Sequence, residues 1–175
     1  VKDSTIWEGL FLELHGDMLD KPLIIGNIYR PPRKLNDNYE TCSEELGNIL
    51  NQVSSLNKEC VIAGDSNIDL LKAAERPVFE DYIDSILANG FVPKITFPTR
   101  FTDNTGTLID NFLCKLSNNY SCCTSGILTN LISDHQPYFI CLDYIHKNQE
   151  PSKSITIPTK AEKFFEKVLN DLSES

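Results

Sequence analysis

The chain of 175 residues is long enough for one domain with its own hydrophobic core. Hydrophobic residues make up 41% of it and charged residues 23%, which excludes a wholly disordered protein. The formal net charge of −9 counts against nucleic-acid binding, because phosphate contacts usually come from Lys, Arg or backbone donors. It does not exclude a metal-dependent nuclease, since a divalent cation can bridge carboxylates and phosphate.

The apolar runs and the cysteines of the chain indicate its cellular compartment. No apolar run approaches the roughly 18 residues of a membrane-spanning helix, and the N-terminal VKDSTIWEG is no signal peptide. Of six cysteines, Cys60 and Cys141 lie in apolar runs and Cys122 and Cys123 are adjacent, without zinc-finger spacing. We therefore expect reduced cysteines and an intracellular protein that does not enter membranes. The chain does not begin with Met, and we expect a fragment of a longer protein.

The first half of the chain alternates between strand and helix signals. In chain order we expect a mostly buried strand at 5–14, a second strand at 23–30, a helix over 39–56, a strand at 60–64 and a helix over 79–87. Pro31 and Pro32 end the second strand because they lack N–H groups. Asn36 or Asp37 is the expected N-cap of the first helix, and Gly90 ends the second.

The second half is mainly β and loop. Strands are expected at 91–97, 107–115, 126–130 and 137–144, with a polar loop at 98–106. The order of elements predicts one α/β layered domain over residues 1–146. Residues 147–175 read as a linker and a short amphipathic helix, with Thr159 and Glu162 as a capping box.

Four polar clusters lie next to apolar runs, where side chains can line a cleft at the rim of a sheet. They are Tyr29, Asp65 with Asn67, Asp110 with Asn111, and Asp134 with His135. Taken singly, each has an ordinary alternative, because Asp and Asn commonly form turns after strands.

Asp110 is the hardest of these to explain as a turn residue. A carboxylate within an apolar run needs a partner, and His135 is a better candidate than His15 in a turn or His146 in a linker. An Asp–His pair fixes the imidazole tautomer and can activate a water for attack on phosphorus or carbonyl carbon. Asp65 and Asn67 would then orient that water and bond the developing negative oxygen.

Four motifs in the order YRPP, IAGDSN, TFPTRFTDNTGTLIDNFLC and GILTNLISDHQPYF carry a family resemblance. They resemble the endonuclease/exonuclease/phosphatase superfamily, and most of all the endonuclease domain of non-LTR (LINE-type) retrotransposons. That domain nicks target DNA to prime reverse transcription, and the resemblance spans roughly residues 1–145. It implies a two-sheet α/β sandwich with the active site at one rim, hydrolysis of DNA phosphodiesters, a downstream reverse transcriptase domain and a nuclear location.

The resemblance also implies catalytic roles by motif. Asp65 and Asn67 correspond to the water-activating Asp and the transition-state-stabilising Asn of the GDxN motif. Tyr29 corresponds to the phosphate-contacting Tyr, and Asp110 and His135 to the carboxylate–imidazole pair.

Metal and phosphate contacts are implied in the same way. The family uses Mg²⁺, with Mn²⁺ as the substitute, and Asp134 corresponds to the aspartate of the SDH motif that supports the metal region. Thr99 and Arg100 are expected to contact the substrate phosphate, with an ordinary loop role as the alternative.

The chain departs from the family pattern in two places. Ser66 stands where the family has an apolar aromatic residue, and in a core this leaves a pocket costing about 2–4 kcal/mol. The family's early Asn and metal-binding Glu precede a strand like 5–14, and neither Glu8 nor Glu13 fits that motif. We therefore expect an N-terminally truncated domain that lacks the first strands of the sandwich.

Two other functions stay open. A phosphoesterase of the same fold, acting on lipid or inositol phosphates, agrees better with the acidic balance. A non-catalytic remnant that serves as an interaction domain agrees with the missing ligands, with Ser66 and with the net charge of −9.

Overall fold

The computed structural model describes residues 4, 6–16, 19, 22–32, 39–117, 120–129 and 132–144. The predicted linker and tail helix of residues 147–175 lie outside this part of the chain. None of the described helices has the length and apolar character needed to cross a membrane.

The described residues form a mixed α/β structure. Its elements are β1 (Glu8–Leu14), β2 (Leu23–Tyr29), α1 (Tyr39–Ser55), β3 (Glu59–Asp65), the 3-10 helix η1 (Leu70–Glu75), α2 (Pro77–Ala88), β4 (Val92–Pro93), β5 (Arg100–Phe101), β6 (Gly106–Thr107), β7 (Asp110–Lys115), β8 (Tyr120–Ile127) and β9 (Tyr138–Tyr144). Strands β1, β2, β3, β7 and β4 make one five-stranded sheet in that order. Only β2 and β3 pair in parallel within it, connected through α1.

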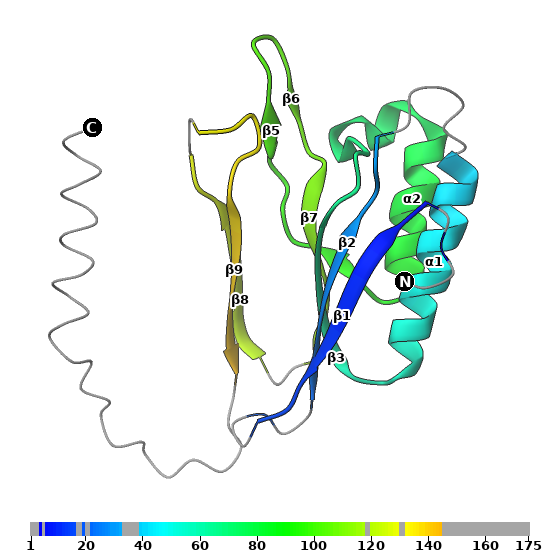
Figure 1. Cartoon of the computed structure of the whole chain (residues 1–175), viewed down its shortest axis with the longest axis vertical. Coiled ribbons are helices and arrows are strands. Elements are labelled where there is room, and N and C mark those ends of the chain that lie inside the picture. The colour runs from blue at the N-terminus through cyan, green and yellow to red at the C-terminus, as the bar shows by residue number, and fades with distance from the viewer. Residues whose placement is uncertain are drawn as a thin grey trace, which may run out of the picture.

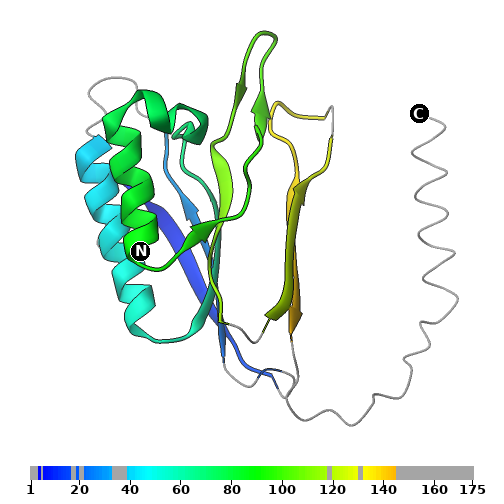
Figure 2. The same ribbon diagram turned by 180° about the vertical axis from the view of Figure 1, so that it is seen from behind.

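Three layers follow from this order (Figure 1). Helices α1 and α2 cover one face of the sheet, and the two-stranded β8–β9 sheet lies on the other, as the view from behind also shows (Figure 2). The β5–β6 hairpin extends beyond the end of β7.

The main core lies between the helices and the sheet. Apolar side chains recur on one face of each helix, so Leu46, Leu50 and Ile86 reach Ile62 on the sheet. The Trp7 indole N–H donates to the Cys42 carbonyl oxygen at 3.1 Å, which fixes the segment before β1 against α1. The helices and strands predicted for the first half of the chain are present with shifted ends, and the N-cap predicted at Asn36 or Asp37 lies outside the described residues.

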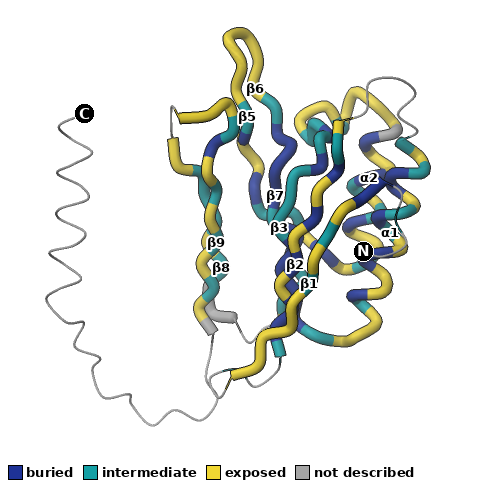
Figure 3. Tube along the Cα trace, viewed as in Figure 1, coloured by how far each residue is buried: buried dark blue, intermediate teal, exposed yellow. Residues whose placement is uncertain are grey.

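The opposite face of the sheet is only partly covered (Figure 3). Val61 and Cys114 pack against the β8–β9 layer, with Ile140 among the side chains that meet them. By register Leu10 and Leu12 lie on this same face, but they are 65% and 56% exposed. The prediction of a mostly buried strand is thus wrong for β1: nothing in the described part of the chain covers this face, and on the other face Gly9 and Phe11 are only half-buried.

Two strand predictions and one loop prediction in the second half of the chain are also inaccurate. The expected strand at 91–97 contracts to Val92–Pro93, because after the Lys94 N–H the Asn111 side chain, and not the β7 backbone, bonds the N–H and carbonyl oxygen of Ile95. The expected loop at 98–106 instead contains the β5–β6 hairpin. Strand β8 begins at Tyr120, before the predicted 126–130, because its partner β9 pairs along that whole length.

Candidate active site at the ends of β2, β3 and β7

Tyr29, Asp65 and Asp110 form one row across the sheet. In the ladders Tyr29 lies opposite Asp65 and Asp65 lies opposite Asp110, so the three side chains share the face that also meets β8–β9. Each stands at the terminus of its strand, where the sheet gives way to loops. The predicted gathering of polar residues at a sheet rim is present.

Gly64 and the turn after Asp65 determine the position of the Asp65 side chain at the end of β3. A side chain at Gly64 would collide with the backbone of Ile28, so only glycine lets β2 and β3 approach this closely here. Directly after Asp65 the chain turns, and Asn67 adopts a left-handed conformation with φ 50°. The Asn67 N–H donates to Asp65 Oδ1 at 2.8 Å, which stabilises the turn.

Arg30 holds this turn from the adjacent strand, a role the sequence analysis missed. It is only 2% exposed, and its Nη1 donates to the carbonyl oxygens of Ser66 at 3.2 Å and Asn67 at 3.5 Å. In return Asn67 Nδ2 donates to the Arg30 carbonyl oxygen at 2.8 Å. The guanidinium carbon lies 5.3 Å from the centre of the Tyr39 ring. The sequence feature that could have predicted this role is a charged residue between an apolar strand and two prolines.

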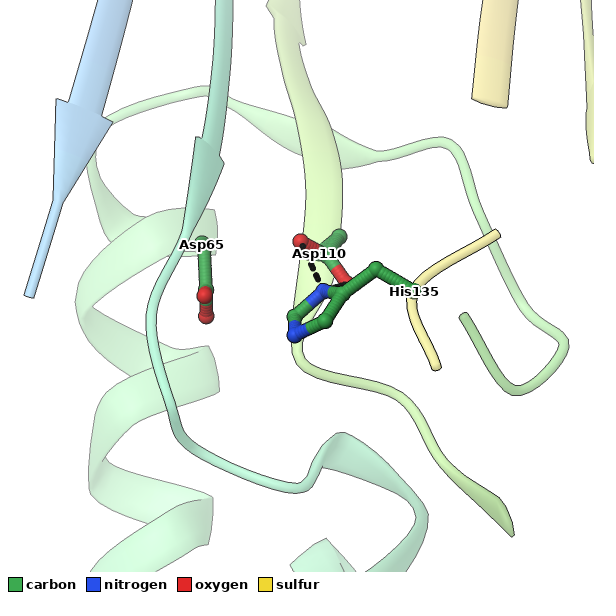
Figure 4. A group of neighbouring side chains, drawn as sticks. All are labelled: Asp65, Asp110 and His135. Atoms are coloured by element: carbon green, nitrogen blue, oxygen red, sulfur yellow. Dashed lines mark hydrogen bonds and ion pairs between the residues drawn. The ribbon is translucent and has the colours of Figure 1, made fainter. Parts of the chain in front are cut away.

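Asp110 and His135 form the predicted carboxylate–imidazole pair. His135 Nδ1 lies 3.1 Å from Asp110 Oδ2, with Asp110 buried and His135 half-buried (Figure 4). Because Asp110 accepts from Nδ1–H in the neutral ring, Nε2 is left as a proton acceptor. The pair thus has the arrangement that a general base needs.

Thr99 fixes the backbone at Asp110 by accepting hydrogen bonds. Its side chain is 0% exposed, and its Oγ1 accepts from the backbone N–H groups of Ile109 at 3.3 Å and Asp110 at 3.1 Å. This geometry gives Thr99 a positioning role and does not support the predicted contact with the substrate phosphate.

Arg100 connects the β5–β6 hairpin to the loop that carries His135. Its Nε donates to Asp134 Oδ2 at 2.7 Å, and its backbone forms a bridge with His135. This hydrogen bond is the main cause that lowers the pKa of the Asp134 carboxyl, which is otherwise in water. Arg100 is partly exposed and still accessible to a phosphate, whereas Asp134 is occupied by Arg100.

Asp65, Asp110 and His135 are the one group of potential metal ligands among the described residues. Their ligand atoms all lie within 4.8 Å of one another, and Asp65 and His135 point into the same space (Figure 4). Two carboxylates and an imidazole fit a divalent cation, and Mg²⁺ is commonly held by one or two carboxylates together with substrate phosphate. Asp134 does not belong to this group.

Burial makes Asp65 a stronger base than an ordinary carboxylate. Desolvation raises its pKa, the negative charge of Asp110 raises it further, and the Asn67 N–H opposes the shift. A carboxylate in this environment attracts protons and cations more strongly than one in water.

Tyr138, the first residue of β9, is another site neighbour that the sequence analysis missed. Its ring packs on Phe112 with centres 4.7 Å apart, between the two sheets. Burial, and after it the negative charge of Asp110, raises the pKa of the phenol to about 12. Tyr138 therefore stays neutral near the two carboxylates. The sequence feature that could have predicted this role is an aromatic residue three positions after His135, on an expected strand.

Ser66 faces the core, as the expectation of a partly filled pocket required. A cavity of about 10 Å³ remains beside it, with Tyr82 and Asn111 in its wall. The hydroxyl accepts from the Ile68 N–H at 3.2 Å and lies 3.1 Å from the Ile109 carbonyl oxygen as a donor. The Ser66 hydroxyl thus finds both a donor and an acceptor within the core.

No known family model matches this sequence, and no curated protein is significantly similar to it. The case for a function therefore depends on the geometry of Asp65, Asp110 and His135 and on the motifs around them.

Proposed function

We propose that this chain is a metal-dependent phosphodiesterase that nicks DNA, the endonuclease domain of a non-LTR retrotransposon. The observation that carries the proposal is the Asp110–His135 pair at 3.1 Å, beside the half-buried Asp65. The same three residue types were expected together from motifs far apart in the sequence. DNA, a downstream reverse transcriptase domain and a nuclear location belong to this proposal.

The finer description of the fold belongs to it as well. We propose a two-sheet α/β sandwich of the endonuclease/exonuclease/phosphatase type that lacks its first strands. Support comes from the mixed sheet with helices on one face and β8–β9 on the other. The exposed Leu10, Leu12 and Ile25 beside β8–β9 support it too, because strands that extended the second sheet would cover them.

The chemistry assigns one task to each side chain. His135 Nε2 takes the proton from the attacking water while the phosphorus–oxygen bond to the leaving sugar oxygen breaks, and that oxygen takes up a proton from solvent. Asp110 stabilises the imidazolium that results. Asp65 accepts the second hydrogen of this water and so orients it. Asn67 Nδ2 has one N–H beyond the bond to Arg30, and with the Tyr29 hydroxyl it donates to the phosphoryl oxygen that gains charge.

Asp65 would hold a Mg²⁺ or Mn²⁺ ion together with substrate phosphate, which leaves His135 Nε2 free to accept the proton. When bound, the ion supplies positive charge that neutralises the phosphate. Arg100 is partly exposed at the rim and can still donate through its other nitrogens, so it neutralises a neighbouring phosphate in the same way.

A substrate comparison tests this function against its same-fold alternative. The full chain with Mg²⁺ is given supercoiled plasmid in one series and soluble inositol phosphates in the other. We expect nicked plasmid and no release of inorganic phosphate. Hydrolysis of inositol phosphates without nicking would instead assign the chain to the phosphoesterases that act on inositol or lipid phosphates.

A non-catalytic binding domain is the second candidate. The observation in its favour is that the potential metal ligands gathered in the described residues number three and include no Glu. Removing a ligand from a metal site commonly lowers rates by orders of magnitude. A folded chain that binds DNA but cleaves neither substrate would establish this alternative.

A further inference from the structure

A surface groove runs between α1 and α2 on the side of the helices that faces away from the sheet. It has a volume of about 500 Å³. Carboxylates and small polar side chains form its walls: Glu40, Ser43 and Glu44 from α1, and Asp81, Asp84 and Ser85 from α2. The groove lies on the opposite side of the five-stranded sheet from the row of Tyr29, Asp65 and Asp110.

The charge of this groove is of one sign. Neither α1 nor α2 contains a Lys or Arg residue. The four wall carboxylates are exposed, and they take part in none of the ion pairs found among the described residues. Asp81 and Asp84 are neighbours on one helix, as are Glu40 and Glu44 on the other, so two acidic rims face each other.

Ser43 gives an independent indication of a ligand. Its side chain is 5% exposed and lines the groove, yet its Oγ has no hydrogen-bond partner within the described part of the chain. A serine within a helix ordinarily bonds a backbone carbonyl one turn back. A buried hydroxyl without a partner is destabilising, and a donor that enters the groove would relieve this.

The spacing of the carboxylates decides what kind of cation fits. Three ligand atoms close enough to share one metal ion occur in the described residues at Asp65, Asp110 and His135, and not in this groove. A cation with several separated donors matches the two rims better. The guanidinium group has five donors in a fixed plane and is weakly hydrated, which suits a partly enclosed acidic groove.

We propose that the groove between α1 and α2 binds an arginine-bearing basic segment of a partner protein. The two acidic rims hold the guanidinium groups, and the Ser43 hydroxyl receives one of their N–H donors. A partner bound here leaves the row of Tyr29, Asp65 and Asp110 free on the other side of the sheet. The proposal goes beyond the nuclease function, and its test needs no turnover.

Fluorescence anisotropy with the full chain tests it, with labelled hexa-arginine as probe and hexa-citrulline as its uncharged analogue. We expect binding of hexa-arginine alone. D81N/D84N should weaken it about tenfold, since two charged hydrogen-bond acceptors are lost. Ser43→Ala should weaken it about threefold and leave the fold intact, as thermal unfolding would check.

The matched control is E8Q/E75Q, which removes the same charge from exposed positions outside the groove. It should change affinity less than about twofold. Asp65→Asn controls in the same way for binding at the candidate active site. Equal losses in D81N/D84N and either control would overturn the proposal, because net charge or the active site would then account for binding. Displacement by spermine at the same charge concentration as hexa-arginine would overturn it in favour of a polyamine site.

Discussion

Asp65 occupies a position that opposes its own ionisation. Its pKa is raised above the ordinary 3.8, mainly by burial, so the folded state holds the proton to higher pH than the unfolded state does. Folding stability therefore falls as pH rises from 3.8 through the raised value. At neutral pH the ionised carboxylate destabilises the fold, as we expect of a residue with the catalytic role proposed for Asp65.

Asp65→Asn removes this charge and keeps the Oδ1 acceptor for the Asn67 N–H. We expect a higher free energy of unfolding than wild type at pH 7, with the difference vanishing below 3.8, and a loss of nicking of about a hundredfold or more. Urea unfolding over this pH range measures the first effect. A variant less stable than wild type at pH 7 would contradict the assigned cause.

Arg30 is expected to act on catalysis through Asn67. Its Nη1 holds two carbonyls of the turn while the guanidinium group lies over the Tyr39 ring, and a lysine ammonium lacks the planar group that stacks there. Arg30→Lys should lower kcat about tenfold or more with a smaller change in KM, because the turn is misplaced while substrate contacts remain. Arg76→Lys is the matched control, since Arg76 also lies over an aromatic ring, that of Phe79, but away from the turn. Equal effects of the two substitutions would remove the special role of Arg30.

At the level of elements, the β5–β6 hairpin and the loop before β9 are tied by Arg100 and Asp134. Hydrogen bonding from Arg100 lowers the pKa of Asp134. The pair therefore stabilises the fold at pH values above the ordinary pKa of an aspartate, and this stabilisation is lost as pH falls through the lowered pKa of Asp134. Arg100→Met should return that pKa to its ordinary range and raise the KM for DNA. A carboxyl titration followed by NMR measures the first effect. An unchanged Asp134 titration would show that the contact does not persist in solution.

In the half-covered sheet, the alternation of apolar residues in the sequence predicts the strands but not which of their faces are buried. Alternation in β1 correctly indicates a strand, and its register with β2 places Phe11 against the helices. Alternation does not reveal that Leu10 and Leu12 lack a covering layer, because the burial of a strand face depends on other elements. The same reason explains why the sequence predicts a loop at 98–106: β5 and β6 are two residues long each, and apart from each other they gain, within the described part of the chain, only the bridge between Arg100 and His135.

On the scale of the whole molecule, the cysteines test the expectation of reduced thiols. Cys42, Cys60 and Cys114 are buried, and burial raises the pKa of Cys60 and of Cys114 to about 12. Cys123 and Cys141 are free thiols with more exposure. In native protein at pH 8 we expect these two to react with a thiol reagent within minutes and the buried three to react only on unfolding. Mass spectrometry of labelled peptides would show the order, and early labelling of Cys60 or Cys114 would contradict the packing.

The sequence was informative about the site where chemistry constrains residue type. A carboxylate in an apolar run needs a partner and His135 is the best candidate, so the sequence alone predicts the Asp110–His135 pair that the structure contains. The supporting contacts were not predictable, because Arg30 and Thr99 act through backbone groups that only the folded sheet brings to them. The hydrogen bonds of Ser66 were hidden for the same reason.

Nicking of supercoiled plasmid by the full chain is the most direct test of the central claim. Wild type is compared with His135→Ala, with EDTA, and with His15→Ala as a control on an exposed histidine outside the site. We expect nicking that requires a divalent cation, falls about a hundredfold or more in His135→Ala and is unchanged in His15→Ala. Nicking that persists in His135→Ala, or a folded wild-type chain that does not nick at all, would contradict the assignment of Asp65, Asp110 and His135 as an active site.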